Sequence, residues 1–185
     1  SMEKTRTIRT WGSFLLLLLL LFVFLIWNVL AGSVKLPVSE ILEILRGRGD
    51  GTQSRILLQI RLPRLLSALI LGGALSVSGY LLQTFFHNPI AGPFVLGISS
   101  GAKLCVSIVM ILLLSRGLVS SSAALIAAAF VGAMGSMGFV LAVSQKVKRM
   151  SLLVICGVMI GYICTAATDL LVTFADDSNI VNLHN

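Results

Sequence analysis

The residues between Arg64 and Lys103 form a long stretch that contains no Lys, Arg, Asp or Glu. A helix of about 20 apolar residues is long enough to cross the hydrocarbon core of a membrane. Turn-forming residues interrupt this stretch near its middle, in the segment Asn88-Pro-Ile-Ala-Gly-Pro93. An uncharged stretch with such a break predicts one membrane-spanning helix, a tight reversal and the start of a second spanning helix.

Composition places the whole chain among integral membrane proteins. Hydrophobic residues make up 57% of the chain and charged residues 11%, with a mean hydropathy of +1.01, whereas about a quarter of the residues in a soluble domain are charged. The net charge of +7 comes from short basic clusters beside apolar stretches. This placement suits membrane topology and lipid headgroups, so we expect contact with lipid and no nucleic-acid partner.

Five apolar stretches are each long enough to span a bilayer. The first follows Lys4, Arg6 and Arg9, but its 19 residues exceed the apolar region of a signal peptide. The predicted spans cover approximately residues 12–30, 65–86, 94–114, 120–144 and 150–174. The predicted fold is therefore all-α, a polytopic helical bundle in which residues 1–185 form a single membrane domain.

The polar connection over residues 32–59 is predicted to lie at the membrane surface and to contain a short amphipathic helix from Ser39 to Leu45. If the N-terminus is cytoplasmic, the basic cluster at 146–149 also lies inside, as the positive-inside rule requires. The segment from the connection to Arg64 then lies outside with six Lys or Arg residues. An acidic extracytoplasmic partner would account for this excess, because arginines form bidentate pairs with carboxylates.

Small residues recur at four-residue spacing in three predicted spans, a pattern that lets helices approach closely in lipid. The stripes are Ala68, Gly72 and Ser76; Ala124, Ala128, Gly132 and Ser136; and Gly157, Gly161 and Thr165. The candidate packing residues are Gly72, Gly73, Ser76, Gly79, Gly132, Gly157 and Gly161.

The cysteines and histidines do not indicate a metal site. Cys105, Cys156 and Cys164 lie in apolar stretches and form no Cys-x-x-Cys pair, and the two histidines, His87 and His184, are far apart in sequence. We therefore expect no metal ligands and no directly bound cofactor.

Two charged residues, Lys103 and Asp169, lie within predicted spans, where ionisable groups are costly and often functional. A position of Lys103 near the cytoplasmic end of its span would let its ammonium reach the headgroups. Asp169 could line a polar pathway or pair with a neighbouring helix. The sequence leaves these alternatives open.

The segment Gly97-Ile-Ser99-Ser-Gly101 formally fits the nucleophile motif of serine hydrolases, but that motif follows a strand and a turn is predicted here. The chain has no Gly-x-x-x-x-Gly-Lys-[Ser/Thr] phosphate loop, so energy from ATP would have to come from another polypeptide. A secondary transporter or channel subunit is an alternative class, and an intramembrane hydrolase is a more distant one.

The order and spacing of several unusual residues resemble a known family. The pattern runs Arg61-Leu-Pro-Arg64, Gly72-Gly-Ala74, Ser78-Gly79, Gln83, Asn88-Pro-Ile-Ala91-x-Pro93 and Leu96-Gly97-x-x-x-Gly101-Ala102. It resembles the permease subunits of type II ABC importers for iron-siderophores, haem and cobalamin. The resemblance implies helices one to five of a ten-helix permease, so the chain is expected to stop partway through a larger protein.

The resemblance also implies a function. The chain would form part of the translocation pathway of an ATP-driven importer in the bacterial cytoplasmic membrane, with ferric siderophores favoured over haem or cobalamin. Its implied partners are a second permease subunit in a homo- or heterodimer, two cytoplasmic ATPase subunits and an extracytoplasmic binding protein. The permease itself would not be an enzyme, because the partner subunits use the ATP.

Within the family pattern, Arg61 and Arg64 correspond to arginines that receive acidic residues of the binding protein. We expect charge reversal at both to weaken docking without unfolding the bundle. Pro63 is predicted in the first turn of the second helix, where it costs no hydrogen bond. The alternative is that both arginines only extend to the headgroups.

The turn that begins at Asn88 lies beside the translocation path in the family. The candidate pathway or gate residues are Asn88, Pro89, Pro93, Gly97, Ser99 and Gly101. Ile90 replaces the usual leucine, and His87 stands where a basic residue is common. A purely structural turn is the alternative, because Asn88 can bond backbone groups that Pro89 leaves unpaired.

Overall fold

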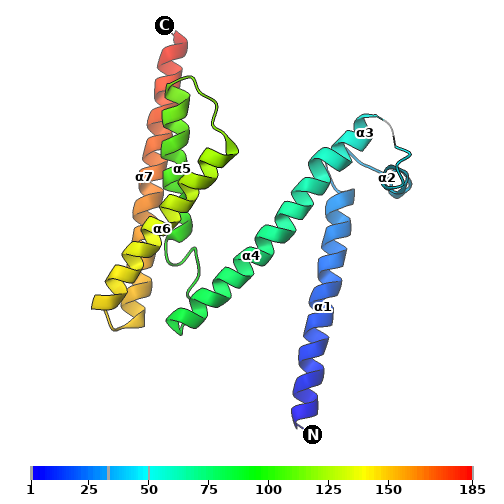
Figure 1. The fold of residues 1–185 in the computed structure, drawn as a ribbon, viewed down its shortest axis with the longest axis horizontal. Helices are drawn as coiled ribbons and strands as arrows, with labels where there is room; N and C mark the ends of the chain where they lie inside the picture. Colours follow the sequence, from blue (N-terminus) through cyan, green and yellow to red (C-terminus); the bar gives the residue numbers. More distant parts are fainter. Residues whose placement is uncertain (1, 33, 50, 185) are drawn as a thin grey trace. The chain divides into compact units, whose positions relative to one another are not determined.

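The computed structural model describes residues 2–32, 34–49 and 51–184, with side chains as far as Asp176, and every regular element in these residues is a helix. The elements are α1 (Met2–Leu30), α2 (Val38–Leu45), α3 (Thr52–Arg55), η1 (Ile56–Arg61), α4 (Leu62–Phe86), α5 (Ile98–Ser115), α6 (Ser122–Lys146) and α7 (Met150–His184) (Figure 1). Five helical segments are long and apolar enough to cross a membrane. The predicted all-α bundle with five spans is confirmed.

The chain forms two compact units, Ser1–Ala74 and Leu75–Asn185. In the first unit, α1 buries none of its residues, which suits a helix whose apolar side chains face lipid or further protein. The core of this unit lies beside the C-terminal end of α1, where Leu36, Ile41, Ile44 and Leu57 pack together. The amphipathic helix predicted in the polar connection is present as α2, and it buries Ile41 and Ile44.

The second span begins earlier than its apolar sequence indicates. Helical structure starts at Thr52, inside the predicted connection 32–59, and not near residue 65. Hydrophobicity marks the part of a helix that crosses lipid, whereas backbone hydrogen bonds decide where the helix begins. Here the additional turns are anchored by Leu57, which is completely buried against α2 and its neighbours.

Pro63 consequently lies inside a helix and not in its first turn, so the prediction for its position is wrong. Proline in a helix interior lacks the N–H for the i→i−4 bond, and its ring clashes with the carbonyl four residues earlier. The π-helical segment η1 precedes it, and the backbone N–H of Leu62 donates to the carbonyl of Leu57, five residues back. This wider turn accommodates the ring.

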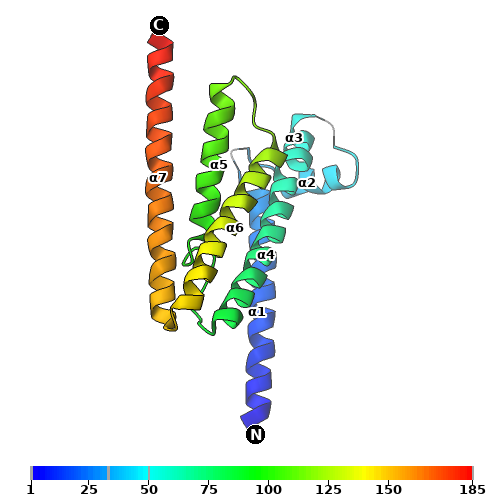
Figure 2. The same cartoon turned by 60° about the vertical axis from the view of Figure 1, so that its left-hand side comes forward.

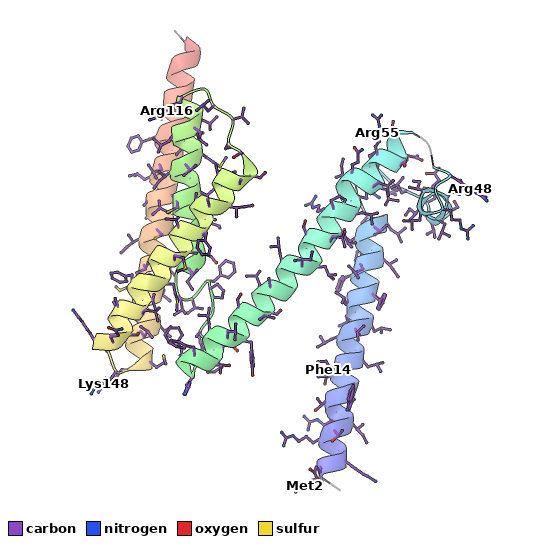
Figure 3. The ribbon with its side chains drawn as sticks, in the orientation of Figure 1. Met2, Phe14, Arg48, Arg55, Arg116 and Lys148 are labelled. Atoms are coloured by element: carbon purple, nitrogen blue, oxygen red, sulfur yellow. The ribbon has the colours of Figure 1, made fainter. Side chains whose placement is uncertain are left out.

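In the second unit, α5 packs against both α6 and α7 (Figure 2). Ser121 caps α6, its side chain accepting a hydrogen bond from the backbone N–H of Ala124. Arg116 and Lys148 lie at opposite ends of this unit (Figure 3). The connection 87–97 packs at the Lys148 end, because buried Phe86 and Ala91 join Val140 and Leu153 in one core.

The backbone of α7 remains helical to His184, beyond the predicted end of the fifth span at residue 174. The apolar part of this helix, Met150–Asp176, is the segment suited to a membrane. The polar residues after Asp176 therefore continue the helix in the described backbone.

Candidate functional site

Arg61, at the end of η1, and Arg64, in the first turn of α4, lie in different surroundings. Arg61 is only 8% exposed. Its Nη1 donates a hydrogen bond of 2.8 Å to the carbonyl of Val29, and its Nη2 donates to the carbonyl of Val34. Val29 lies in the last turn of α1, whose carbonyls have no partner within the helix. The guanidinium therefore ties the end of α1 and the connection that follows it to η1.

Gly32 provides the space for this guanidinium. A Cβ atom at position 32 would lie 2.3 Å from Nη2 and 2.9 Å from Cζ of Arg61. Any larger residue would displace the Arg61 side chain from its carbonyl partners. No local pattern in the sequence indicates this contact, because Gly32 and Arg61 are separated by the whole connection.

Arg64 is exposed, one helical turn beyond Arg61. Both arginines border a pocket of about 400 Å³ that is also lined by Asn28, Gly32 and Ile60. Four further basic residues between α1 and η1 are exposed, namely Lys35, Arg46, Arg48 and Arg55. Figure 3 places Arg48 and Arg55 at the end of the unit remote from Met2. This end can attract carboxylates, and Arg64 has the freedom to bind one.

The turn that begins at Asn88 is internally hydrogen-bonded. Oδ1 of Asn88 accepts from the backbone N–H of Ile90 at 3.0 Å, and its carbonyl accepts from Ala91 at 3.2 Å. The carbonyl of Pro93 accepts from the N–H groups of Ile98 and of Ser99, which joins the turn to the start of α5. Pro89 is exposed, whereas Pro93 is partly buried. These contacts describe a rigid turn and leave its predicted gate role a prediction.

Gly97 and Gly101 bring α5 into direct backbone contact with its neighbours. Gly97 has a left-handed φ of 73°, and a Cβ there would lie 2.8 Å from the carbonyl oxygen of Gly157. A Cβ at Gly101 would lie 1.8 Å from Oγ of Ser136 and 2.9 Å from the carbonyl oxygen of Gly132. These two pathway candidates are therefore packing positions in this structure.

Other candidate packing residues differ in their surroundings. Gly157 and Gly161 face the start of α5, and the α6 stripe of Ala128, Gly132 and Ser136 is buried. Ser76 is exposed, and a Cβ at Gly72, Gly73 or Gly79 would meet no described heavy atom within 4 Å. The packing role of these α4 positions stays a prediction.

A polar pocket of about 250 Å³ lies between α5 and α7. Its lining comprises Phe94, Ser99, Ser100, Lys103, Thr165, Thr168 and Asp169. The structure thus brings together the two charged residues that the sequence identified separately. It also adds Ser100, Thr165 and Thr168, which the sequence had not connected with these charges.

Lys103 lies away from the end of the second unit that carries the basic cluster 146–149. The start of α5 at Gly97 is level with Gly161, well inside α7. Asp169 follows Met150 by nineteen residues, which is about 28 Å along a helix. This distance approaches the thickness of a hydrocarbon core, about 30 Å. The pocket therefore lies toward the opposite end.

The described residues offer no group of three or more His, Cys, Asp or Glu side chains that could hold a metal ion. Within the same residues, Ser99 lies in the first turn of α5 and follows a turn and not a strand. A hydrolase nucleophile elbow requires the strand, so this local structure does not match one.

Comparisons with known proteins agree on one family. A model described as the FecCD transport family matches residues 17–185. The hemin transport system permease protein HmuU of Yersinia pestis is 36% identical over 68% of this chain and 38% of its own length. The ferric enterobactin transport system permease protein FepD of Escherichia coli is 40% identical over 57% of this chain and 30% of its own. The vitamin B12 import system permease protein BtuC of Klebsiella pneumoniae is 35% identical over 90% of this chain and 47% of its own length.

A solved structure described as an inward-facing metal-chelate type ABC transporter is also similar. It aligns with a TM-score of 0.61 and 28% identity, covering 84% of this chain and 45% of that one. The chain spans at most about half the length of these relatives.

Proposed function

Because the chain belongs to the FecCD transport family, we propose that it forms part of the transmembrane permease of an ATP-driven importer. The observation that carries the proposal is the family match over residues 17–185, which coincides with five helices suited to crossing a membrane. Permease subunits of this family are not enzymes themselves, so ATP hydrolysis belongs to separate subunits. The assembly would contain a second permease subunit, two cytoplasmic ATPase subunits and an extracytoplasmic binding protein.

The proposed location is the bacterial cytoplasmic membrane, with a cytoplasmic N-terminus. The basic cluster 146–149 lies at one end of the second unit, together with the turn that begins at Asn88. The positive-inside rule favours this end as cytoplasmic. With a cytoplasmic N-terminus, α1 would cross the membrane once, and the exposed arginines that follow it would face the binding protein.

The proposed cargo is a ferric siderophore. Relatives named for hemin, ferric enterobactin and vitamin B12 share 36%, 40% and 35% identity with the chain, which supports a bulky metal chelate as the substrate class. The ferric enterobactin relative supports a siderophore, although over a shorter aligned segment.

Docking of the binding protein is assigned to Arg64 and the exposed basic residues around it. Arg61 has its donors directed at two carbonyls and little exposed surface, so its proposed role is to hold the head of the helix in place. Exposed arginines can pair with carboxylates and also speed association through long-range attraction. Arg61 would thus position the helix, and Arg64 would bind the partner protein.

Uptake by the complete transporter tests the proposed function. The full-length permease, its ATPase and its binding protein are expected to accumulate ferric enterobactin in vesicles only when ATP is supplied. Replacing the ATPase with a hydrolysis-deficient variant should abolish uptake, because residues 1–185 contain no phosphate loop and the ATPase would supply the energy. Uptake driven by an ion gradient without ATP would instead indicate a secondary transporter.

A further inference from the structure

We propose that the pocket between α5 and α7 is an entry subsite that binds an anionic, oxygen-rich arm of the transported chelate. The inference rests on the proposed function and adds to it a named site within the membrane. The pocket lies inside one compact unit, so its lining residues are placed relative to one another.

Two opposite charges from different helices meet at this pocket. Lys103 is the only charged residue of α5, and Asp169 is the only one in α7 between Met150 and Phe174. Charged side chains within spans are rare and face the bundle interior or a water-filled cavity. Both side chains are exposed at the surface of this unit, and the cavity that they share is accessible to a polar ligand.

The polar groups of the pocket are largely unpaired within the described residues. Lys103 and Asp169 form no ion pair within 4 Å there, and the hydroxyls of Ser99 and Ser100 have no hydrogen-bond partner in the same part of the structure. By contrast, Thr165 and Thr168 donate to the carbonyls of Gly161 and Cys164. The pocket thus offers an ammonium, a carboxylate and two hydroxyls to a ligand, and unpaired polar groups in a membrane are costly.

The arrangement of these groups defines the chemistry of the ligand. Ser99, Ser100 and Lys103 lie in the first two turns of α5, where the helix dipole adds positive potential to the ammonium. This side of the pocket suits an anionic oxygen, whereas Asp169 on α7 accepts from an N–H or O–H group. A volume of about 250 Å³ corresponds to about eight water molecules, which fits one arm of a chelate and not a whole siderophore.

The helix packing explains why the cavity forms at this level. Gly97 lies against Gly157 and Gly161, which brings the start of α5 to the backbone of α7. Farther along α5, Ser100 and Lys103 border the pocket together with Thr165, Thr168 and Asp169 of α7. With the basic cluster 146–149 of this unit on the cytoplasmic side, the pocket lies toward the outer face, where cargo released by a binding protein enters.

Thiol labelling of the complete transporter in vesicles tests the subsite without requiring transport. Thr168→Cys is introduced after Cys105, Cys156 and Cys164 are changed to serine, and Ile163→Cys, on the same helix but outside the pocket, serves as control. A water-soluble anionic thiol reagent should label Thr168→Cys, and saturating ferric enterobactin should slow that labelling at least about fivefold. Labelling of Ile163→Cys should not respond to the chelate.

Charge variants separate a ligand site from an internal ion pair. Lys103→Gln should remove most of the protection by ferric enterobactin, and Lys103→Arg should retain it. The exchange Lys103→Asp with Asp169→Lys should also lose protection, because it reverses the charges that the ligand meets. Restored protection in the exchange variant would overturn the proposal. The proposal would also be overturned if ferric enterobactin failed to protect Thr168→Cys in a transporter that imports this chelate. If the transporter showed neither import nor protection, that result would count against the proposed function as well.

Discussion

Arg64→Glu is expected to weaken docking of the binding protein by roughly 30-fold or more, without changing the stability of the permease. Arg64 is exposed and makes no contact that the fold requires, whereas reversing its charge replaces attraction to a carboxylate by repulsion. Such a change at an interface costs about 2 kcal/mol or more, and 1.4 kcal/mol is a factor of ten in Kd. Binding of the purified binding protein to the complete transporter, at low and at high salt, measures the effect.

Arg61→Ala is expected to lower the stability of the permease, which Arg64→Glu leaves unchanged. It removes the donors to the carbonyls of Val29 and Val34, and a hydrogen bond that involves a charged group contributes about 1.5–3 kcal/mol. The earlier expectation that charge reversal at Arg61 would spare the fold is therefore replaced by a predicted loss of stability. Denaturation of the full-length permease in detergent should show a lower midpoint for Arg61→Ala and an unchanged midpoint for Arg64→Ala.

Gly32→Ala is the matched control for this pair. It leaves the charge of Arg61 intact, but its Cβ occupies the place of the guanidinium. If Arg61 is a positioning residue, Gly32→Ala should lower stability as Arg61→Ala does. Equal stability of Arg61→Ala and the wild type, with docking reduced as in Arg64→Ala, would contradict the assigned division of roles.

Gly101→Ala is expected to destabilise the bundle of α5, α6 and α7 by about 1–3 kcal/mol, the usual cost of adding a methyl group to a packed core. Oγ of Ser136 can rotate away from the new Cβ, but the carbonyl oxygen of Gly132, 2.9 Å away, belongs to the backbone and cannot. The helices must therefore separate. Lipid offers no hydrophobic force to hold them together, because helix association there depends on close packing.

Gly135→Ala on α6 provides the control for this change. A Cβ at Gly135 would meet no described heavy atom within 4 Å, so the substitution should leave stability unchanged or raise it by about 0.5–1 kcal/mol through helix propensity. The midpoint of denaturation in detergent compares the two variants. A Gly101→Ala permease as stable as Gly135→Ala would show that the two helices are not in backbone contact at this level.

The sequence predicted the spanning helices well because the signal is local. A helix that crosses a bilayer requires about 20 apolar residues. Each of the five apolar stretches can be recognised from its own residues, without reference to the rest of the chain. Local hydrophobicity does not report where backbone hydrogen bonding begins. The start of the second helix at Thr52 and the π-helical turn before Pro63 were therefore found only in the structure.

The sequence by itself determined the all-helical membrane fold, the turn at Asn88 and the identity of the residues that carry charge within the spans. Only the tertiary structure decided that Arg61 is buried against two carbonyls while Arg64 is exposed, and that Lys103 and Asp169 share one pocket. The physical reason is distance along the chain. Spacing within a helix fixes which residues share a face, whereas the level at which two helices touch depends on close glycine contacts such as that between Gly97 and Gly161.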